Sequence, residues 1–173
     1  MKKQNRLLSL ILSLFLLLFT LVPQSALTVK AEGNSEMAVH FIDVGQGDGI
    51  YMETPEGTTV LIDGGSSDNK KLYEYTLEPF LLSKGRKYLD AVIVTHCDND
   101  HISGIRKIFT EDNIKVKTLY MPSTTMTDEV YTELIELAAE SGTDIKYIYE
   151  GYSMTEKDFY MYCLHPEYEY DTS

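Results

Sequence analysis

The sequence predicts a layered α/β protein with a mixed β-sheet, and three observations carry this prediction. Three short segments of β-branched and alternating residues, separated by glycine-containing turns, indicate an antiparallel meander between residues 37 and 62. Segments with helical and strand-like periodicity then alternate from residue 70 onward. Between them lies a continuous apolar run at 89–95, which is typical of a central strand covered on both faces. This order indicates helices packed on a sheet that contains antiparallel and parallel pairs.

The first half of the chain is expected to fold as the meander, a helix and the central strand. The strands of the meander are expected at 37–44, 50–54 and 58–62, with turns at 45–49 and 55–57. A helix is expected over 70–83, where apolar residues recur at helical spacing. Pro79 is expected to end or kink this helix, because proline has no backbone N–H for the helical ladder.

The second half continues the alternation of helices and strands. A helix over 101–109 places its apolar side chains on one face, and a strand is expected at 116–120. Residues 127–129 then supply a capping residue and two acids for the start of a further helix, which residues 141–142 end. The last two strands are expected at 145–149 and 158–164.

Residues 1–31 have the pattern of a secretory signal peptide. Three basic residues precede an apolar run of 16 residues at 7–22, and small residues precede a cleavage site after Ala31. The run is shorter than the roughly 20 residues that a membrane-spanning helix needs. A secreted protein without stable membrane association is therefore expected, and an uncleaved membrane anchor is the alternative.

Residues 32–173 are expected to form one domain, long enough to bury a hydrophobic core. The whole chain has a formal charge of −12, and loss of residues 1–31 leaves 11 basic and 27 acidic side chains, or −16. Such a charge repels nucleic acid and anionic membranes unless cations intervene. Two cysteines, Cys97 and Cys163, are too few for a disulfide-dense scaffold, and free thiols are favoured over a disulfide.

The most chemically specific segment, residues 96–101, directly follows the apolar strand. Four of its side chains are of types that bind metals: His96, Asp98, Asp100 and His101. Residues two apart on an extended segment point the same way, so His96 and Asp98 are expected to share one metal. Asp100 and His101 are expected to hold a second metal where the next helix begins, at the carboxyl end of a central strand. The alternative is a polar loop in which Asp100 only caps the helix.

The spacing His-x-Asp-x-Asp-His resembles that of the metallo-β-lactamase superfamily, whose commoner form is His-x-His-x-Asp-His. The variant with Asp98 resembles the hydrolase domain of ComEC-type competence proteins. Four further blocks agree with that subgroup, at residues 39–48, 60–65, 78–85 and 164–166. The resemblance covers roughly residues 38–166.

This resemblance implies an αββα sandwich and a hydrolase with two divalent metal ions. A hydroxide held between the metals would be the nucleophile. The oxygen ligand Asp98 shifts the preference from strict Zn²⁺ toward tolerance of Mn²⁺ or Mg²⁺, so that Zn²⁺ or Mn²⁺ is expected, with Mg²⁺ as a further option. His40 and His165 are interpreted as structural. The residues assigned to the site by resemblance are His96, Asp98, Asp100 and His101 as ligands, with Asp100 also catalytic, and Asp43, Gln46, Asp48 and Asp63 as residues that support the ligands.

The predicted function is an exported metal-dependent hydrolase whose substrate is a small-molecule or nucleic-acid phosphodiester, such as DNA. Members of the subgroup carry two more ligands downstream, in a Gly-Asp turn and a His-His-Gly segment, and neither occurs before Ser173. The domain is therefore expected to be the amino-terminal part of the sandwich. The alternative function is a non-catalytic truncated remnant or binding module. A true β-lactamase is disfavoured because that group has His where Asp98 stands. The oligomeric state is left open.

Overall fold

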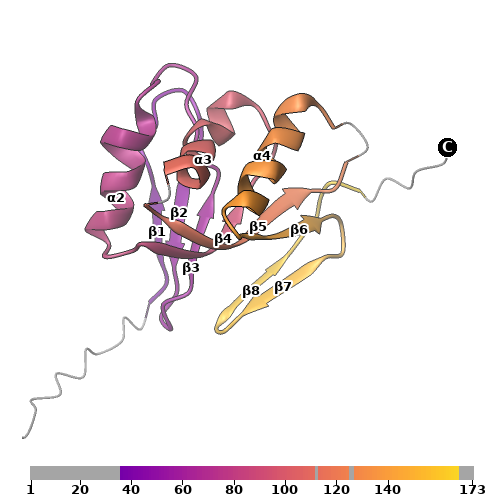
Figure 1. Cartoon of the computed structure of the whole chain (residues 1–173). Coiled ribbons are helices and arrows are strands. Elements are labelled where there is room, and N and C mark those ends of the chain that lie inside the picture. Colours follow the sequence, from indigo (N-terminus) through magenta and orange to yellow (C-terminus); the bar gives the residue numbers. More distant parts are fainter. Residues whose placement is uncertain (1–35, 112, 125–126, 168–173) are drawn as a thin grey trace, which may run out of the picture. The chain divides into compact units, whose positions relative to one another are not determined.

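A mixed six-stranded sheet lies at the centre of the part of the chain that the structure describes (Figure 1). The computed structural model describes residues 36–111, 113–124 and 127–167, which all belong to the unit Gly33–Ser173. The signal peptide expected at residues 1–31 lies outside the described residues. Within these ranges, no helix combines the length and the apolar character that crossing a membrane requires.

The strands follow one another across the sheet in chain order. β1, β2 and β3 pair antiparallel, as the predicted meander requires, and β3 to β6 pair parallel. β4 therefore lies inside the sheet, as its continuous apolar run predicts. The strands are β1 (Ala38–Phe41), β2 (Ile50–Glu53), β3 (Thr59–Ile62), β4 (Tyr88–Ile93), β5 (Lys115–Pro122) and β6 (Asp144–Ile148).

The helices cover one face of this sheet (Figure 1). They are η1 (Tyr73–Leu77), α2 (Glu78–Ser83), α3 (Asn99–Glu111) and α4 (Glu129–Glu140). The main core forms where they meet the sheet, because Tyr51, Leu61, Val92 and Leu119 lie side by side in register on that face and are fully buried or nearly so. The apolar stripes of α3 and α4 pack onto this row and supply Ile102, Ile105, Ile108, Leu134 and Ala138.

A β-hairpin covers the other face of the sheet. It consists of β7 (Ser153–Glu156) and β8 (Phe159–Tyr162), and it forms a second, two-stranded sheet. β8 confirms the strand predicted at 158–164, whereas β7 was missed, since its four residues contain a single apolar side chain. The second core consists of Val60, Ala91, Ile93 and Tyr120 from the large sheet with Met154 and Phe159 from the hairpin. A helix layer, a mixed sheet and a second sheet on the far face confirm the predicted fold class.

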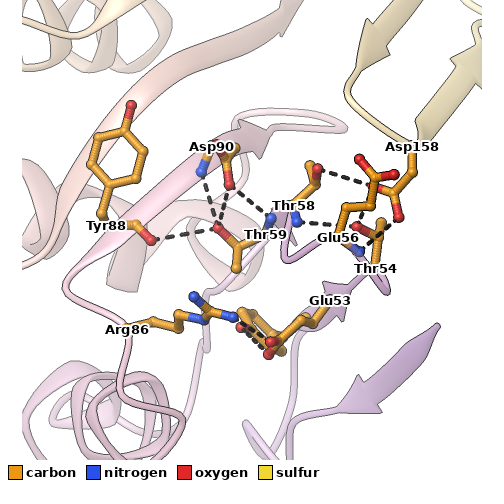
Figure 2. A network of polar contacts seen from close by, with 10 residues as sticks. Glu53, Thr54, Glu56, Thr58, Thr59, Arg86, Tyr88, Asp90 and Asp158 are labelled. Carbon is orange, nitrogen blue, oxygen red and sulfur yellow. Dashed lines mark hydrogen bonds and ion pairs between the residues drawn. The ribbon is translucent and has the colours of Figure 1, made fainter. Parts of the chain in front are cut away.

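Polar contacts fasten the turn of this hairpin to the β2–β3 turn (Figure 2). The carboxylate of Asp158 accepts hydrogen bonds from the hydroxyl of Thr54 at 2.5 Å and from the amide of Glu56 at 2.9 Å. The neighbouring carboxylate of Asp90 accepts from the amide and the hydroxyl of Thr59, at 2.9 and 3.0 Å. The contacts of Asp158 fix one end of the hairpin at the edge opposite to the carboxyl ends of the parallel strands.

Pro79 does not end the helix predicted at 70–83, and the change from η1 to α2 falls directly before this proline. The chain is helical through η1, and α2 follows at once with Pro79 in its first turn, where a missing N–H costs nothing. Before the proline the ladder widens to the π pattern, in which the amide of Glu78 bonds the carbonyl of Tyr73. A local change of hydrogen-bond pattern therefore accommodates the proline and lets the helix continue.

Candidate active site

The segment 96–101 lies where the fold brings two parallel strand ends together. β3 and β4 pair parallel up to Ile62 and Ile93, and the amide of Asp63 donates to the carbonyl of Ile93 at 2.9 Å. The residues that follow both strands therefore leave the sheet side by side. Asp63 comes from β3, and the segment from β4 passes into α3, which begins at Asn99.

The carboxylate of Asp63 connects the side chains of this region. Asp63 is 3% exposed, and its carboxylate accepts three hydrogen bonds. Oδ1 accepts from the amide of Thr95 at 2.9 Å, and Oδ2 accepts from the hydroxyl of Thr95 at 2.7 Å. Nδ1 of His101 lies 2.9 Å from the same Oδ2. The backbone of Asp63 has a positive φ of 53°, a conformation in which aspartate is enriched among the non-glycine residues.

These contacts determine which nitrogen of each histidine faces outward. An ionised carboxylate can only accept, so Nδ1 of His101 carries the proton that it donates to Asp63. The hydroxyl proton of Thr95 is also donated to Asp63, so Thr95 accepts from Nδ1 of His96 at 3.1 Å. In the neutral form of each ring, Nε2 then keeps its lone pair. One buried carboxylate thus orients two imidazoles, in the manner of residues that support metal-binding histidines.

Each of these Nε2 atoms lies near one carboxylate oxygen. Nε2 of His96 is 3.6 Å from Oδ2 of Asp98, and Nε2 of His101 is 3.7 Å from Oδ2 of Asp48. Two ligands of one tetrahedral ion, with bonds of about 2.1 Å, lie about 3.4 Å apart. The side chains of Asp98 and Asp48 are 80% and 64% exposed, so both have room to adjust. The two imidazole centroids are 3.7 Å apart, which joins the two pairs into one cluster.

The fit of this cluster to a metal is therefore incomplete within the described part of the chain. The donor types and the ring orientations suit divalent ions, but no group of three or more His, Cys, Asp or Glu side chains gathers there around one point. The Asp100 side chain, predicted as a ligand and catalytic residue, makes no hydrogen bond or ion pair with the described residues. Its carbonyl accepts from the amide of Asp48 at 3.2 Å.

The other residues that the sequence singled out make contacts of different kinds. Gln46 takes part through its backbone, since its amide donates to Asp68 at 3.0 Å and its carbonyl accepts from Ser67 at 2.9 Å. The carboxylate of Asp43 accepts weakly from the amide of Gly45 at 3.3 Å. Neither the Gln46 nor the Asp43 side chain bonds to the described residues of segment 96–101. His40 packs against Phe80 and Tyr51 on the helix face, with ring centroids 5.6 and 6.0 Å apart.

Thr95 and Asp68 are two residues of the candidate site that the sequence did not single out. Thr95 links Asp63 to His96, and its place directly before the first histidine was the available signal. Asp68 joins two loops, because it accepts from the amide of Gln46 and, at 2.8 Å, from the hydroxyl of Ser66. These two hydrogen bonds hold the pKa of its carboxyl below the ordinary value. The sequence offers no comparable signal for Asp68.

Close backbone contact between the β3 loop and α3 fixes the position of His101. The amide of Gly64 donates to the carbonyl of His101 at 2.8 Å, and the amide of Gly104 donates to the carbonyl of Gly64 at 2.9 Å. A Cβ at Gly104 would lie 2.2 Å from that Gly64 oxygen, and a Cβ at Gly65 would lie 2.5 Å from the backbone of His101. Only glycine allows this approach, which explains Gly65 and Gly104.

A cavity of 840 Å³ opens beside the cluster, between the carboxyl ends of the strands and the end of the hairpin. Its walls include His96, Asp98 and His165 together with apolar and aromatic side chains from β5, α4 and β8. No lysine or arginine occurs among the described residues that line it. His165, interpreted as structural from the sequence, thus shares this cavity with His96.

The two cysteines also line this cavity, and both are free thiols. Burial raises the pKa of the Cys97 thiol to about 11, and the nearby carboxylates of Asp128, Asp63 and Asp98 add to this effect. Cys97 therefore stays protonated at neutral pH, which makes it a poor nucleophile.

Comparison with known proteins identifies the family. The model of the metallo-beta-lactamase superfamily matches residues 42–140. ComE operon protein 3 of Bacillus subtilis (strain 168) is 36% identical over 147 residues, which are 78% of this chain and 19% of that protein. The chain thus spans about a fifth of the length of this curated relative. The crystal structure of the metallo-beta-lactamase fold protein YhfI from Bacillus subtilis matches with a TM-score of 0.50 and 20% identity, over 72% of this chain and 51% of that chain. The chain belongs to the metallo-beta-lactamase superfamily.

Proposed function

We propose that this chain is an exported metal-dependent hydrolase that acts on phosphodiesters. The observation that carries the proposal is the orientation of His96 and His101 by the single buried carboxylate of Asp63, which leaves both Nε2 atoms free to bind metal. Asp98 and Asp48 would add an oxygen ligand beside each ring. Bound Zn²⁺ or Mn²⁺ would supply an activated water and polarise the scissile bond.

Phosphodiesters are proposed as substrates because the chain resembles ComE operon protein 3 and, with Asp98, the ComEC-type variant of the motif. The cavity beside the cluster lacks cationic side chains among its described residues, so an anionic substrate would depend on the metal ions for its attraction. The same dependence follows from the overall charge of −12. DNA and small phosphodiesters both remain within this proposal.

The hydrolase proposal is tested with the 173-residue chain, bis(p-nitrophenyl) phosphate and a titration of Mn²⁺ or Zn²⁺. We expect a metal-dependent rate that falls about 100-fold or more in His96→Ala, because that variant removes a metal ligand. His40→Ala is the matched control, since His40 packs on the helix face, away from the cluster. A rate that is independent of metal, or equal in His96→Ala and the unmodified chain, would contradict the proposal.

A non-catalytic binding module is the second candidate. It is favoured by the absence of three convergent donors among the described residues. Equilibrium dialysis against Zn²⁺ and Mn²⁺ separates the two candidates, since an enzyme of this kind must retain metal at micromolar concentration. Metal binding with turnover supports the hydrolase, and a folded chain without either property supports the module.

Export is proposed from the sequence pattern of residues 1–31. Mass spectrometry of the protein recovered from the medium of an expressing bacterial culture tests it. The expected amino-terminal residue is Glu32. A cell-bound protein that still contains residues 1–31 would instead indicate the membrane anchor.

A further inference from the structure

A second hollow, which we call the polar groove, lies along α3. It has a volume of 430 Å³, within the roughly 300–1,000 Å³ of small-molecule sites. Its walls come from the segment 66–73 and from α3 and α4. Asn99 lines it and stands directly between Asp98 and Asp100, so the groove begins at the candidate active site.

The charge of the polar groove is opposite to that of the whole chain. Lys70, Arg106 and Lys107 line it, against a single acid, Glu133. The lining therefore carries a formal charge of +2 in a chain whose formal charge is −12. Such a local reversal of sign attracts anions that the remaining surface repels.

The three cations differ in how far the protein neutralises them. Arg106 forms an ion pair with Glu133, and Lys107 pairs with Glu111 at 3.1 Å along one exposed face of α3. Exposed pairs of this kind are weak and leave donors for another anion. Lys70 has no ion-pair or hydrogen-bond partner among the described residues.

The neutral groups of the groove are largely satisfied by the protein itself. The hydroxyl of Ser66 donates to Asp68 at 2.8 Å, and that of Ser103 donates to the carbonyl of Ser66 at 3.2 Å. One N–H of the Asn99 amide also donates to the carbonyl of Ser66, at 3.2 Å, and the other is left for a ligand. The donors that remain are thus cationic groups with an amide beside them, and a ligand of this groove must supply acceptors.

We propose that the polar groove binds phosphate groups of a phosphorylated ligand. A phosphate offers several acceptor oxygens and a negative charge, which match the ammonium of Lys70, the guanidinium of Arg106 and the amide of Asn99. The ligand is a small phosphorylated compound or the backbone of a nucleic acid, which share this chemistry. The inference concerns binding and stands whether or not the chain hydrolyses phosphodiesters.

Binding is measured by isothermal titration of the 173-residue chain in EDTA and 50 mM salt, with inorganic pyrophosphate in one arm and an eight-nucleotide oligothymidylate in the other. Without divalent metal, the result does not depend on the hydrolase proposal. We expect Lys70→Ala to weaken binding about fivefold, since it removes one exposed charge contact. Lys71→Ala is the matched control, because Lys71 lies over the ring of Tyr75, at 5.3 Å, and does not line the groove.

The two arms identify the source of the phosphate. Binding of pyrophosphate alone, weakened in Lys70→Ala, assigns a small phosphorylated ligand, and tighter binding of the oligonucleotide with the same sensitivity assigns a nucleic-acid backbone. The inference is overturned if neither probe binds, or if Lys70→Ala and Lys71→Ala have equal affinities.

Discussion

The cavity at the strand ends and the polar groove share no lining residue, and their linings are opposite in character. The cavity of 840 Å³ is lined by apolar and aromatic side chains, by His96 and by Asp98, without lysine or arginine among its described residues. The groove of 430 Å³ is lined by hydroxyls, amides and three cations. Asp98 faces the first hollow and the next residue, Asn99, faces the second.

Under the proposed function, this difference divides two tasks of a phosphodiesterase. The cavity side would hold metal ions through His96 and Asp98, and it offers apolar contact for the uncharged part of a substrate. The groove side offers positive charge that does not depend on metal. The cause lies in the layers, since the cavity is closed by the apolar end of the hairpin, whereas the groove lies among the solvent-facing residues of α3 and α4.

The largest effect is expected from removing the buried carboxylate that orients the two histidines beside the cavity. Asp63→Ala should lower the free energy of unfolding by about 3 kcal/mol, because it removes a buried acceptor of three hydrogen bonds and leaves their donors unpaired. Urea denaturation measures the change. Asp43→Ala is the control, an exposed aspartate with one weak bond, for which a change below about 0.5 kcal/mol is expected. Equal changes in the free energy of unfolding for the two substitutions would refute this structural role of Asp63.

The next largest effect is expected where α3 meets the β3 loop. Gly104→Ala should lower the free energy of unfolding by about 2 kcal/mol, because its Cβ would lie 2.2 Å from the Gly64 carbonyl oxygen. Helix propensity alone would change stability in the other direction by about 1 kcal/mol. Ala139→Gly, at an exposed position of α4, measures the size of that propensity effect. A Gly104→Ala chain more stable than the unmodified one would show that the loop yields easily.

Salt concentration should affect ligand binding in the two hollows to different extents. Raising the salt concentration from 50 to 200 mM should weaken oligothymidylate binding to the polar groove roughly twentyfold, because contact with about three cations releases counterions from the strand. Binding of the neutral dye Nile red in the apolar cavity should change less than about twofold over the same range, since burial of apolar surface is not screened. Fluorescence titrations with both probes test this. An equal loss of affinity for oligothymidylate and for Nile red would mean that the two probes bind at one site.

The smallest effect concerns the hairpin that closes the apolar cavity. Burial raises the pKa of Asp158, but hydrogen bonds from Thr54, Glu56 and Thr58 outweigh it and hold that pKa below its ordinary value of 3.8. A depressed carboxyl pKa stabilises the fold above the unfolded pKa, and this contribution is lost as the pH falls through the folded pKa. The hairpin should therefore loosen only below about pH 4.

Hydrogen exchange of residues 153–162 measures this loosening. Asp158→Asn should raise exchange at pH 7 to the level that the unmodified chain reaches in acid, while Asp144→Asn, at the exposed start of β6, should change nothing. Equal exchange in Asp158→Asn and the unmodified chain at pH 7 would show that the turn contacts do not hold the hairpin.

The periodicity of the sequence was sufficient to predict the central sheet and the position of the cluster at the end of a strand. The meander of β1 to β3, the buried β4 and the capped helix α4 are local patterns, and each follows from spacing and turn residues. β7 was missed because its stability comes from packing Met154 against the large sheet and not from its own composition. The π-helix before Pro79 was missed because a change of hydrogen-bond register leaves no periodic signal.

For the site, the sequence by itself determined which side chains follow β4 directly, because a motif is a local run of side chains. The tertiary structure alone decided that Asp63, from another strand, orients both histidines, and that Asp48 lies near Nε2 of His101. It also decided that an apolar cavity reaches Asp98 and a cationic groove reaches the next residue, Asn99. These features depend on which distant residues the layers bring together, and spacing along the chain does not record that.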